Sequence, residues 1–334
     1  MILVTGGTGL VGSHLLYYLL KENKSVRAIH RASSDLDSVK RVFSYYSDAS
    51  EEIFNKIEWI VADITDVPAL ENAFGGITHV YHVAANISFD PKEYYTLKKT
   101  NIEGTANVVN LSLANHVTKL CHVSSVATLG KALPNALITE NTDWNPEAKN
   151  NVYGITKYGA EMEVWRASQE GLDVVMINPG VILGAGFWDE GSGYIIKRAA
   201  TKQGFYTNGC MGFVDVQDVV RAMIILMQSD VKNERYILVG ENVSYQKLQS
   251  TLAGRFNKKP AKRLSRGLML WINRADWFSH TFFGSKRRMQ KSMVEFLFED
   301  VTFDNSKIKN ELEFVFTPLE TTLQRVAERY SISS

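Results

Sequence analysis

The sequence predicts an α/β fold, a doubly wound parallel sheet with a smaller, mostly helical C-terminal lobe. Short apolar runs alternate with helical patterns through residue 178, as in sheets whose parallel strands are joined by helices. The first run is followed by glycines at positions 6, 9 and 12 and then by an apolar helical stretch. A length of 334 residues suits about two structural units, one of which is the sheet.

The composition is that of an ordinary globular chain, with 45% hydrophobic and 22% charged residues. No apolar run reaches the ~18 to 20 residues that a membrane span requires. The two cysteines, Cys121 and Cys210, are too few for a disulfide framework and predict reduced thiols in the cytoplasm. No signal peptide is expected, because the glycine pattern follows the first strand at once, and no metal-ligand set is predicted.

A phosphate cradle is predicted where the first strand, 2–5, meets the first helix. Glycine lets the backbone turn sharply and lets a pyrophosphate approach without meeting a Cβ atom. The helix N-terminus supplies free N–H groups and the positive end of a dipole. The residues predicted to face a cofactor here are Gly6, Thr8, Gly9, Leu10 and Val11. The alternative is a glycine-rich turn that binds nothing.

The second strand, 25–30, ends at His30 and Arg31, with no carboxylate before Asp35. A site for NAD normally has an acidic residue here, which accepts hydrogen bonds from the ribose 2′-hydroxyl. An arginine instead pairs with the 2′-phosphate of NADP. Arg31 therefore favours NADP(H), with NAD(H) as the alternative cofactor. The alternative for Arg31 itself is an ordinary exposed loop cation.

Two further strand ends complete the predicted adenine and ribose side of the site. Strand 56–61 is followed by Asp63 and Ile64, and strand 79–83 is followed by Ala84 and Ala85. Ligands bind at the carboxyl ends of the strands in this architecture. Asp63 either accepts a hydrogen bond from an adenine amino group or caps a helix. The small side chains of the alanines leave room for a cofactor.

The fifth and sixth strands, 119–123 and 172–178, are followed by residues that stand at the carboxyl edge of the predicted sheet. These are Ser124 and Ser125 after the fifth strand, and Pro179 and Val181 after the sixth. A long helix that begins at Asp90 and runs toward His116 carries Asn101.

A helix over 151–170 carries Tyr153 and Lys157, which share one face because they are four residues apart. An ammonium group near a phenol favours the phenolate and lowers the pKa of the tyrosine. Such a tyrosine can give a proton to a carbonyl that is being reduced, or take one from an alcohol. The spacing alone is not specific, since it recurs at Tyr17/Lys21, Tyr94/Lys98 and Tyr95/Lys99. Only Tyr153 lies downstream of a serine pair at a strand end.

The alternation of strands and helices weakens after residue 183. We predict a Rossmann-type cofactor domain formed by 1–183 together with about 209–240. The segments 184–208 and 241–334 then form the substrate-binding lobe. Its pocket is not readable from the sequence, and Ser88, Phe89 and Tyr194 are substrate candidates by position only.

Over essentially its whole length the chain resembles the extended short-chain dehydrogenase/reductases. Residues 5–12, TGGTGLVG, are similar to the TGxxGxxG cofactor motif of that family, and residues 153–157, YGITK, to its YxxxK motif. Ser125, five residues before Gly130, matches the catalytic serine of the family better than Ser124 does.

The resemblance implies a role for each of these positions. Ser125 would hydrogen-bond the substrate oxygen, Tyr153 would exchange the proton, and Lys157 would hold the ribose and tune the tyrosine. Asn101 would position a proton relay, or it is a buried structural residue. The cofactor contacts that the resemblance implies for adenine and ribose are at Asp63, Ala84 and Ala85, and those beside the nicotinamide are at Pro179 and Val181.

Within the family, the chain resembles the dihydroflavonol, cinnamoyl and aldehyde reductase branch most. Val126 and Ala127 stand where sugar-nucleotide dehydratases carry an acid pair, and Arg31 stands where sugar-nucleotide epimerases mostly carry an acid. We therefore predict an NADPH-dependent oxidoreductase that interconverts a carbonyl and an alcohol on a small molecule. The alternatives are an NAD-dependent sugar-nucleotide epimerase and a non-catalytic NAD(P)-sensing protein.

Charge is unevenly distributed along a chain whose net charge is only +1. The segment 255–291 holds eleven Lys and Arg and a single acid, Asp276, with Trp and Phe between them. It is either a contact surface for a membrane or other anionic partner, or a helical lobe with solvated basic faces. No nucleic-acid motif appears. Because family members often pair through two long helices, a homodimer through 92–115 and 151–170 is also expected.

Overall fold

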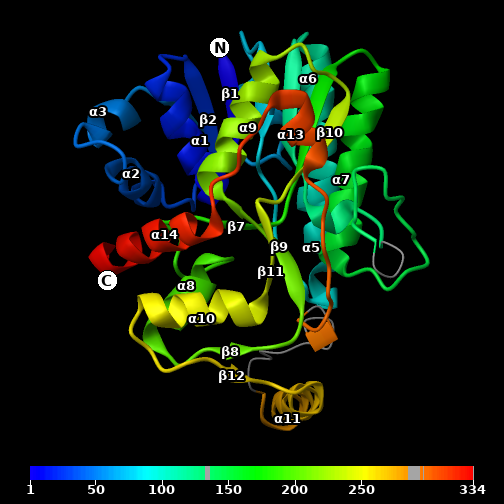
Figure 1. The fold of residues 1–334 in the computed structure, drawn as a ribbon. Coiled ribbons are helices and arrows are strands. Elements are labelled where there is room, and N and C mark those ends of the chain that lie inside the picture. Colours follow the sequence, from blue (N-terminus) through cyan, green and yellow to red (C-terminus); the bar gives the residue numbers. More distant parts are fainter. Residues whose placement is uncertain (132–135, 285–293, 296, 334) are drawn as a thin grey trace.

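The computed structural model describes residues 1–131, 136–284, 294–295 and 297–333. Seven parallel strands form a central sheet in the order β10-β6-β5-β4-β1-β2-β3 (Figure 1). The strands are β1 (Ile2–Thr5), β2 (Val26–His30), β3 (Glu58–Val61), β4 (His79–His82), β5 (Lys119–Val123), β6 (Asp173–Pro179) and β10 (Glu234–Leu238). The predicted parallel sheet is therefore confirmed, with 234–238 as its outermost strand.

The strand order reverses beside β1, because β2 and β3 lie on one side of it and β4, β5 and β6 on the other. At such a switch point the connections leave toward opposite faces of the sheet and open a crevice at the carboxyl ends of the strands. Thr5, His82 and Val123 end the three central strands at this edge. The edge is therefore where a ligand is expected.

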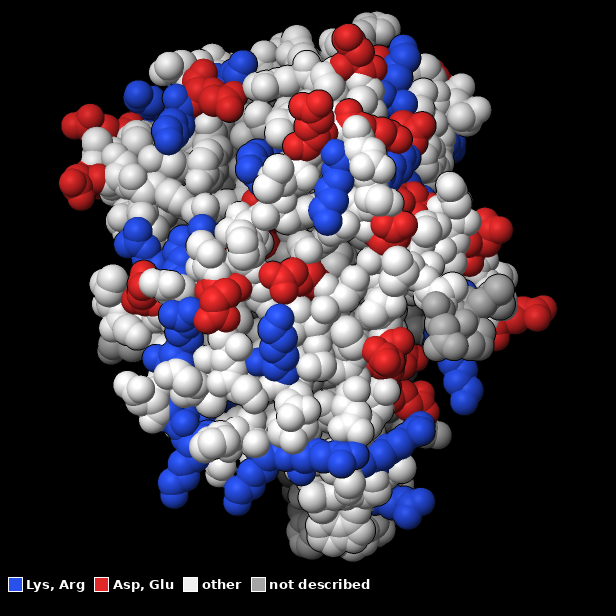
Figure 2. All heavy atoms as spheres, in the orientation of Figure 1, with Lys and Arg blue, Asp and Glu red and all other residues white. Residues whose placement is uncertain are grey.

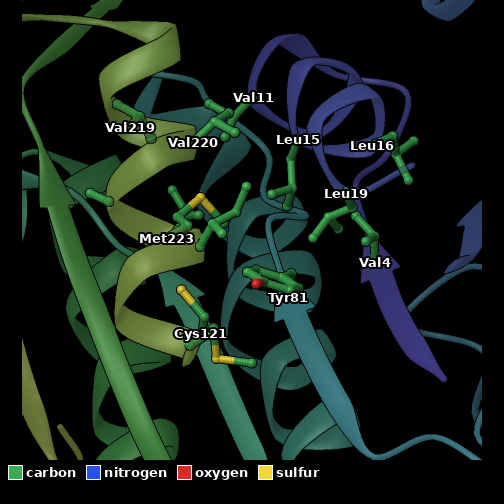
Figure 3. Close-up of a cluster of buried hydrophobic side chains, with 14 of the residues drawn as sticks. Val4, Val11, Leu15, Leu16, Leu19, Tyr81, Cys121, Val219, Val220 and Met223 are labelled. Carbon is green, nitrogen blue, oxygen red and sulfur yellow. The ribbon is translucent and has the colours of Figure 1, made fainter. Parts of the chain in front are cut away.

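Helices cover both faces of the sheet. One face carries α1 (Leu10–Lys21), α2 (Leu36–Ser44), α3 (Ser50–Phe54) and α9 (Val216–Gln228), and the other carries α4 (Val67–Glu71), α6 (Gly104–Ala114) and α7 (Val152–Gln169). Figure 3 shows Leu15 and Leu19 of α1 facing Met223 of α9 above Tyr81 and Cys121 of the sheet. These side chains belong to one buried apolar cluster. Burying them against the sheet is the main force that holds the two helices there.

The predicted long helix from Asp90 is present in four consecutive pieces. They are a 3₁₀ turn over Pro91–Glu93, α5 (Tyr94–Leu97), a π-helical turn over Lys98–Glu103, and α6. A second 3₁₀ turn, Val126–Thr128, follows β5. π-helical turns occur often at functional sites, and this one carries Asn101.

A second, smaller layer lies below the central sheet in Figure 1. Its three-stranded sheet is formed by β7 (Val181–Leu183), β9 (Cys210–Asp215) and β11 (Glu241–Ser244), and a separate pair by β8 (Phe205–Tyr206) and β12 (Lys262–Arg263). Two helices, α8 (Gly193–Thr201) and α10 (Tyr245–Arg255), pack there. The sequence analysis predicted helices in this region and did not predict the small sheets, whose strands are only two to six residues long.

The described part of the chain also contains α11 (Arg266–Phe283), α13 (Ser306–Leu312) and α14 (Leu319–Ser333). α13 lies beside β10, and Ile308 and Phe314 join the apolar cluster between α1 and α9. From α14, Arg325 pairs with Asp215, and Arg329 donates to the carbonyl oxygen of Tyr45. None of the described helices is long and apolar enough to cross a membrane, and both cysteines are free thiols.

Candidate active site

The glycine turn between β1 and α1 is shaped by close backbone contacts. Gly6 has φ of +69°, and a Cβ atom there would lie 2.6 Å from the backbone nitrogen of Ala84. A Cβ atom on Gly12 would collide with the carbonyl oxygen of Gly6. On Gly9 it would meet only that same oxygen, at 3.6 Å, and would stand in the open space at the start of the helix. Gly6 and Gly12 thus form the turn, and Gly9 keeps the space above it clear.

This turn presents backbone donors to that space. Ser13 is the first residue of α1 whose N–H reaches a carbonyl across the turn, that of Gly9 at 2.9 Å. Among the described residues, no backbone acceptor pairs with the N–H groups of Leu10, Val11 and Gly12. No acidic residue stands in the first turn of the helix. Unpaired donors at the positive end of a helix fit a phosphate group, so the turn suits the pyrophosphate of a dinucleotide.

The predicted cradle residues take different parts in this arrangement. Gly6, Thr8, Gly9 and Leu10 are all partly exposed at the turn. The side chain of Val11 is buried in the cluster that α1 and α9 share, as Figure 3 shows, so only its backbone N–H is available to a ligand.

The end of β2 carries an unbalanced positive charge. Arg31 is exposed, and no acid or acceptor among the described residues pairs with its guanidinium. Asp35, the first carboxylate after the strand, is engaged elsewhere: it caps α2 by accepting hydrogen bonds from the N–H groups of Asp37 and Ser38 and from the Ser38 hydroxyl. Hydrogen bonding by Ser38 lowers the pKa of Asp35 further below its usual range. At this strand end the guanidinium of Arg31 is thus available to an anionic group, and no free carboxylate of the described chain competes for it.

The residues that follow β3 and β4 differ in how they face the cradle. The Oδ1 atom of Asp63 accepts hydrogen bonds from the N–H and hydroxyl of Thr65, both at 2.8 Å. Asp66, not Asp63, caps α4. The side chain of Ile64 packs in the core against Gly104, and is not turned toward the cradle. Ala84 donates to the hydroxyl of Thr5, and Ala85 is exposed at the sheet edge.

The structure brings Ser125, Tyr153 and Lys157 together at the same edge. Ser125 caps the 3₁₀ turn after β5 by accepting from the N–H of Ala127 at 3.1 Å, and it lies close enough to Tyr153 to influence the pKa of the phenol. Lys157 is buried, and its Nζ donates to the carbonyl oxygen of Val123 at 2.8 Å. The 3₁₀ turn packs on α7, which explains how a strand end and a helix 28 residues apart share one site.

The pKa of Tyr153 is not lowered, as the sequence had predicted, but raised. Burial raises the pKa of Tyr153 above its usual value, although the nearby Ser125 hydroxyl opposes the shift. The expected lowering by Lys157 is absent, because the lysine Nζ is turned to the Val123 carbonyl and desolvation dominates. Burial also lowers the pKa of Lys157 to about 8, against the opposing charge of Glu161. At neutral pH Tyr153 is thus a neutral phenol, which is the form that can donate a proton.

Ser124 and Ser125 are distinguished by their partners. Ser124 is buried and donates to the Oε2 atom of Glu161 at 2.6 Å. The same oxygen accepts from Thr128 at 2.7 Å and from the amide of Asn178 at 3.1 Å. The hydroxyl of Ser124 is therefore committed to the interior, whereas Ser125 is partly exposed beside Tyr153.

Asn101 is buried, and its amide is fully used within the chain. Its Oδ1 atom accepts from the N–H of Asn86 at 2.7 Å, and its Nδ2 atom donates to the Asn86 carbonyl and to the Thr156 hydroxyl. It thereby ties the loop after β4 to α7. This geometry is that of a residue that positions the loop beside Ala85 and the helix of Tyr153.

Three buried residues at the site, Glu161, His82 and His122, were not predicted from the sequence. Glu161 lies one turn after Lys157 and binds Arg235 at 2.7 Å as well as Ser124. His82 and His122 face each other from paired positions of β4 and β5, with ring centroids 5.1 Å apart. His122 lies 3.4 Å from the Nζ of Lys157. The i, i+4 spacing of Lys157 and Glu161 could have pointed to Glu161, and the matching register of the two strands to the histidine pair.

The remaining predicted residues lie beyond β6 or away from the sheet edge. Pro179 is buried at the end of β6, and Val181 begins β7 with its side chain partly exposed. The ring of Phe89 lies 5.7 Å from that of Tyr153, whereas Tyr194 lies exposed on α8. Of the competing tyrosine–lysine pairs, Tyr17 is buried against Tyr46 and Tyr95 is 79% exposed. Two surface hollows, one beside Pro318 and one beside Trp144, are lined by none of the predicted site residues.

Comparison with known proteins identifies a family and several similar reductases. Residues 2–240 match the family described as NAD dependent epimerase/dehydratase. The "Putative dihydroflavonol 4-reductase" of Synechocystis sp. is 31% identical over 258 residues, which cover 75% of this chain and 71% of that protein. Cinnamoyl-CoA reductase 1 of Oryza sativa subsp. japonica is 26% identical over 272 residues, covering 78% and 77% respectively.

Solved structures share the fold over the whole chain. The structure of gox2253 superimposes with a TM-score of 0.82 at 25% identity, covering 100% of this chain and 98% of that one. UDP-glucose 4-epimerase of Thermotoga maritima, solved with UDP-glucose, gives a TM-score of 0.79 at 20% identity, with 99% of each chain covered. At that identity the second likeness establishes the fold alone.

Proposed function

The chain belongs to the NAD dependent epimerase/dehydratase family and is an NAD(P)-dependent oxidoreductase-type enzyme; from this premise we propose that it is an NADPH-dependent carbonyl reductase. Its substrate is a small aldehyde or ketone, or the alcohol in the reverse direction. The observation that carries the proposal is the placement of Ser125 beside Tyr153 at the sheet edge, where the turn after β5 packs on α7, with buried Lys157 one turn further along that helix. The reductases among the relatives support the same reading.

The chain's own groups account for binding of the cofactor. The N–H groups of Leu10, Val11 and Gly12 would hold the pyrophosphate, and Arg31 would pair with a 2′-phosphate. Asp63, Ala84 and Ala85 would line the adenine and ribose, and Pro179 and Val181 the nicotinamide. When bound, the nicotinamide supplies the hydride.

The proton chemistry belongs to Tyr153 and Ser125. The carbonyl oxygen accepts hydrogen bonds from both hydroxyls, which polarises the carbonyl. As negative charge develops on that oxygen, the phenol of Tyr153 gives it a proton. The raised pKa of Tyr153 keeps the phenol protonated at neutral pH, which supports the reductive direction. Lys157 would hold the ribose, and its hydrogen bond to the carbonyl oxygen of Val123 keeps α7 beside the strand end that carries the serine.

A cytoplasmic location is part of this proposal, and the two free thiols support it because such thiols persist in reducing compartments. A homodimer through the helices of 92–115 and 151–170 also remains a proposal.

Cofactor titration tests the proposal first. Nicotinamide fluorescence would report binding of NADPH and NADH to the wild-type chain, to Arg31→Ala, and to Arg41→Ala as a control for an exposed arginine on the neighbouring helix α2. We expect NADPH to bind at least ~10-fold tighter than NADH, a difference of ~1.4 kcal/mol, and Arg31→Ala alone to abolish the preference. Tightly retained NAD would favour a sugar-nucleotide epimerase, and binding of neither cofactor would refute both.

A carbonyl screen follows for the NADPH-binding chain. Oxidation of NADPH by aldehydes or ketones, lost in Tyr153→Phe while NADPH still binds, would separate a reductase from a non-catalytic sensor. A sensor would bind NADPH and turn over no carbonyl compound in the wild-type chain.

A further inference from the structure

Helix α11 exposes several large apolar side chains. It lies at the lower end of the molecule, away from the central sheet (Figure 1). Its inward-facing residues include Met269 and the polar Asn273, which are 3% and 8% exposed. Trp271 and Phe282 are 67% and 63% exposed. A helix on the surface of a water-soluble domain normally turns its apolar face inward.

Most of the exposed apolar residues form one stripe along the helix, and Trp277 lies beside it. Leu268, Trp271, Phe278 and Phe282 follow the spacing of successive turns, which puts them on a single face of the 18-residue helix. The rings of Phe278 and Phe282 pack side by side with centroids 4.5 Å apart. From residue 268 to residue 282, at the helical rise, the stripe is ~21 Å long. Contiguous exposed apolar surface of this kind marks a site of interaction.

Positive charge surrounds the stripe. Residues 255–284 contain seven Lys and Arg and one acid, Asp276. Six of the cations are exposed: Lys258, Lys259, Lys262, Arg263, Arg266 and Arg274. In Figure 2 the blue side chains line the lower edge of the molecule directly above the protruding helix. Residues 285–291, the rest of the basic segment predicted from the sequence, lie outside the described residues.

We propose that α11 and the adjoining basic residues dock on the surface of an anionic lipid bilayer. The Trp and Phe side chains would enter the boundary between headgroups and acyl chains, where aromatic rings are favoured. The Lys and Arg side chains would face the lipid phosphates. This contact is peripheral, as for amphipathic helices that lie in the plane of the interface. It is independent of the chemistry proposed for Ser125 and Tyr153.

The charge distribution selects this occupant over a second copy of the chain. Pairing two α11 stripes would place two clusters of like charge against each other, and like charges in contact oppose association. An anionic surface instead gains from every one of the exposed cations, at ~1 kcal/mol for each that lies near it.

Vesicle co-sedimentation tests the proposal. The full chain would be mixed with phosphatidylcholine vesicles, with or without about a third phosphatidylglycerol, at low and at high salt. We expect binding to the anionic vesicles at low salt, at least ~10-fold weaker binding at high salt, and little binding to the neutral vesicles. Absence of binding, or equal binding to both vesicle types in all conditions, would overturn the proposal.

Two variants and their controls assign the binding to α11. Trp271→Ser/Phe278→Ser/Phe282→Ser removes the stripe, and Val61→Ser/Val315→Ser/Ile332→Ser removes exposed apolar residues elsewhere. Lys258→Glu/Lys259→Glu lies in a loop and leaves the helix intact, with Lys21→Glu/Lys24→Glu as its control. We expect both α11-side variants to lose binding and both controls to keep it. If the controls lose it equally, or if the stripe variant instead dissociates a dimer in sedimentation velocity, the proposal is wrong.

Discussion

The Nζ atom of Lys157 lies 2.8 Å from the carbonyl oxygen of Val123 and donates a hydrogen bond to it. Val123 is the last residue of β5, and Ser124 and Ser125 follow it at once. The bond therefore fixes helix α7 to the strand end that carries the serine. Lys157 thus determines the placement of Ser125 as well as that of its own helix neighbour Tyr153.

The charge of Lys157 predicts a pH dependence. Because burial lowers its pKa to about 8, the ammonium is lost as the pH rises through that value, while the phenol of Tyr153 stays protonated. We expect kcat/KM for reduction to fall above about pH 8 and NADPH to bind more weakly there. Steady-state kinetics would show the decline in the wild-type chain. For Lys157→Met we expect low activity that does not fall further above about pH 8. If the fall persists in this variant, another group is responsible for it.

The same pKa shift makes a prediction about stability. Between about pH 8 and the ordinary lysine value of 10.5, the unfolded chain keeps a proton on residue 157 that the folded chain has released. The free energy of unfolding should therefore gain a contribution from Lys157 that increases with pH across this window. Urea unfolding of the wild type and Lys157→Met at both ends of the window would measure it. A difference between the two chains that does not change with pH would contradict the assignment.

Ser125 and Ser124 give a matched pair for the chemical step. Ser125→Ala removes the hydroxyl beside Tyr153, and we expect kcat to fall by about 10²-fold or more while NADPH still binds. Ser124→Ala removes one of the donors to Glu161, so it should lower the free energy of unfolding by about 1 to 3 kcal/mol and leave more activity. Kinetics and urea unfolding on both variants test this. The reverse ranking of kcat would make Ser124 the functional serine.

We expect substitution of Glu161 to destabilise the fold more than substitution of any other residue discussed near the site. Its side chain is fully buried and bonds to Ser124, Thr128, Asn178 and Arg235. Glu161→Gln leaves the arginine charge unbalanced in the interior, and we expect a loss of about 3 to 5 kcal/mol in the free energy of unfolding.

The control for Glu161 lies on the same helix. Glu163 pairs with Arg166 at the surface, so Glu163→Gln should cost less than about 1 kcal/mol. Equal effects of the two substitutions in urea unfolding would mean that the buried network contributes little.

Substitution of Gly9 should affect cofactor binding without affecting the stability of the fold. A methyl group there would occupy the space above the helix N-terminus without a backbone clash. We expect Gly9→Ala to weaken NADPH binding at least ~10-fold while unfolding free energy changes by less than about 1 kcal/mol. Gly254→Ala, in the open surface of α10, should leave binding unchanged and stabilise the chain by about 0.4 to 1 kcal/mol. Unaltered affinity in Gly9→Ala would place the phosphate elsewhere.

The parallel sheet could be predicted because most of its strands are apolar runs that are buried on both faces. The strands 2–5, 26–30 and 119–123 show this pattern directly in the sequence. The small sheets could not be predicted in the same way. β8 and β12 are two residues long, and their pairing joins positions 205 and 262, which no local pattern links.

The candidate site was predictable where it depends on local order along the chain. Gly6, Gly9 and Gly12 are close in sequence, and so are Tyr153 and Lys157, so spacing was enough. The titration of Tyr153 was not predictable, because it depends on burial and on a partner, Ser125, that is 28 residues away. Glu161 was missed for the same reason, since its role arises from donors on β6, β10 and the turn after β5.

The contacts that residues 306–333 make with the first part of the chain have a consequence for the order in which it folds during synthesis. Arg329 reaches the carbonyl oxygen of Tyr45, and Ile308 and Phe314 fill the cluster that Leu15 and Leu19 begin. These partners are separated by nearly the whole chain, and such contacts form slowly because long loops must close first. While the ribosome is still making residues 306–333, the apolar cluster on this face of the sheet remains incompletely covered. In that interval the nascent chain depends on protection of that cluster against aggregation.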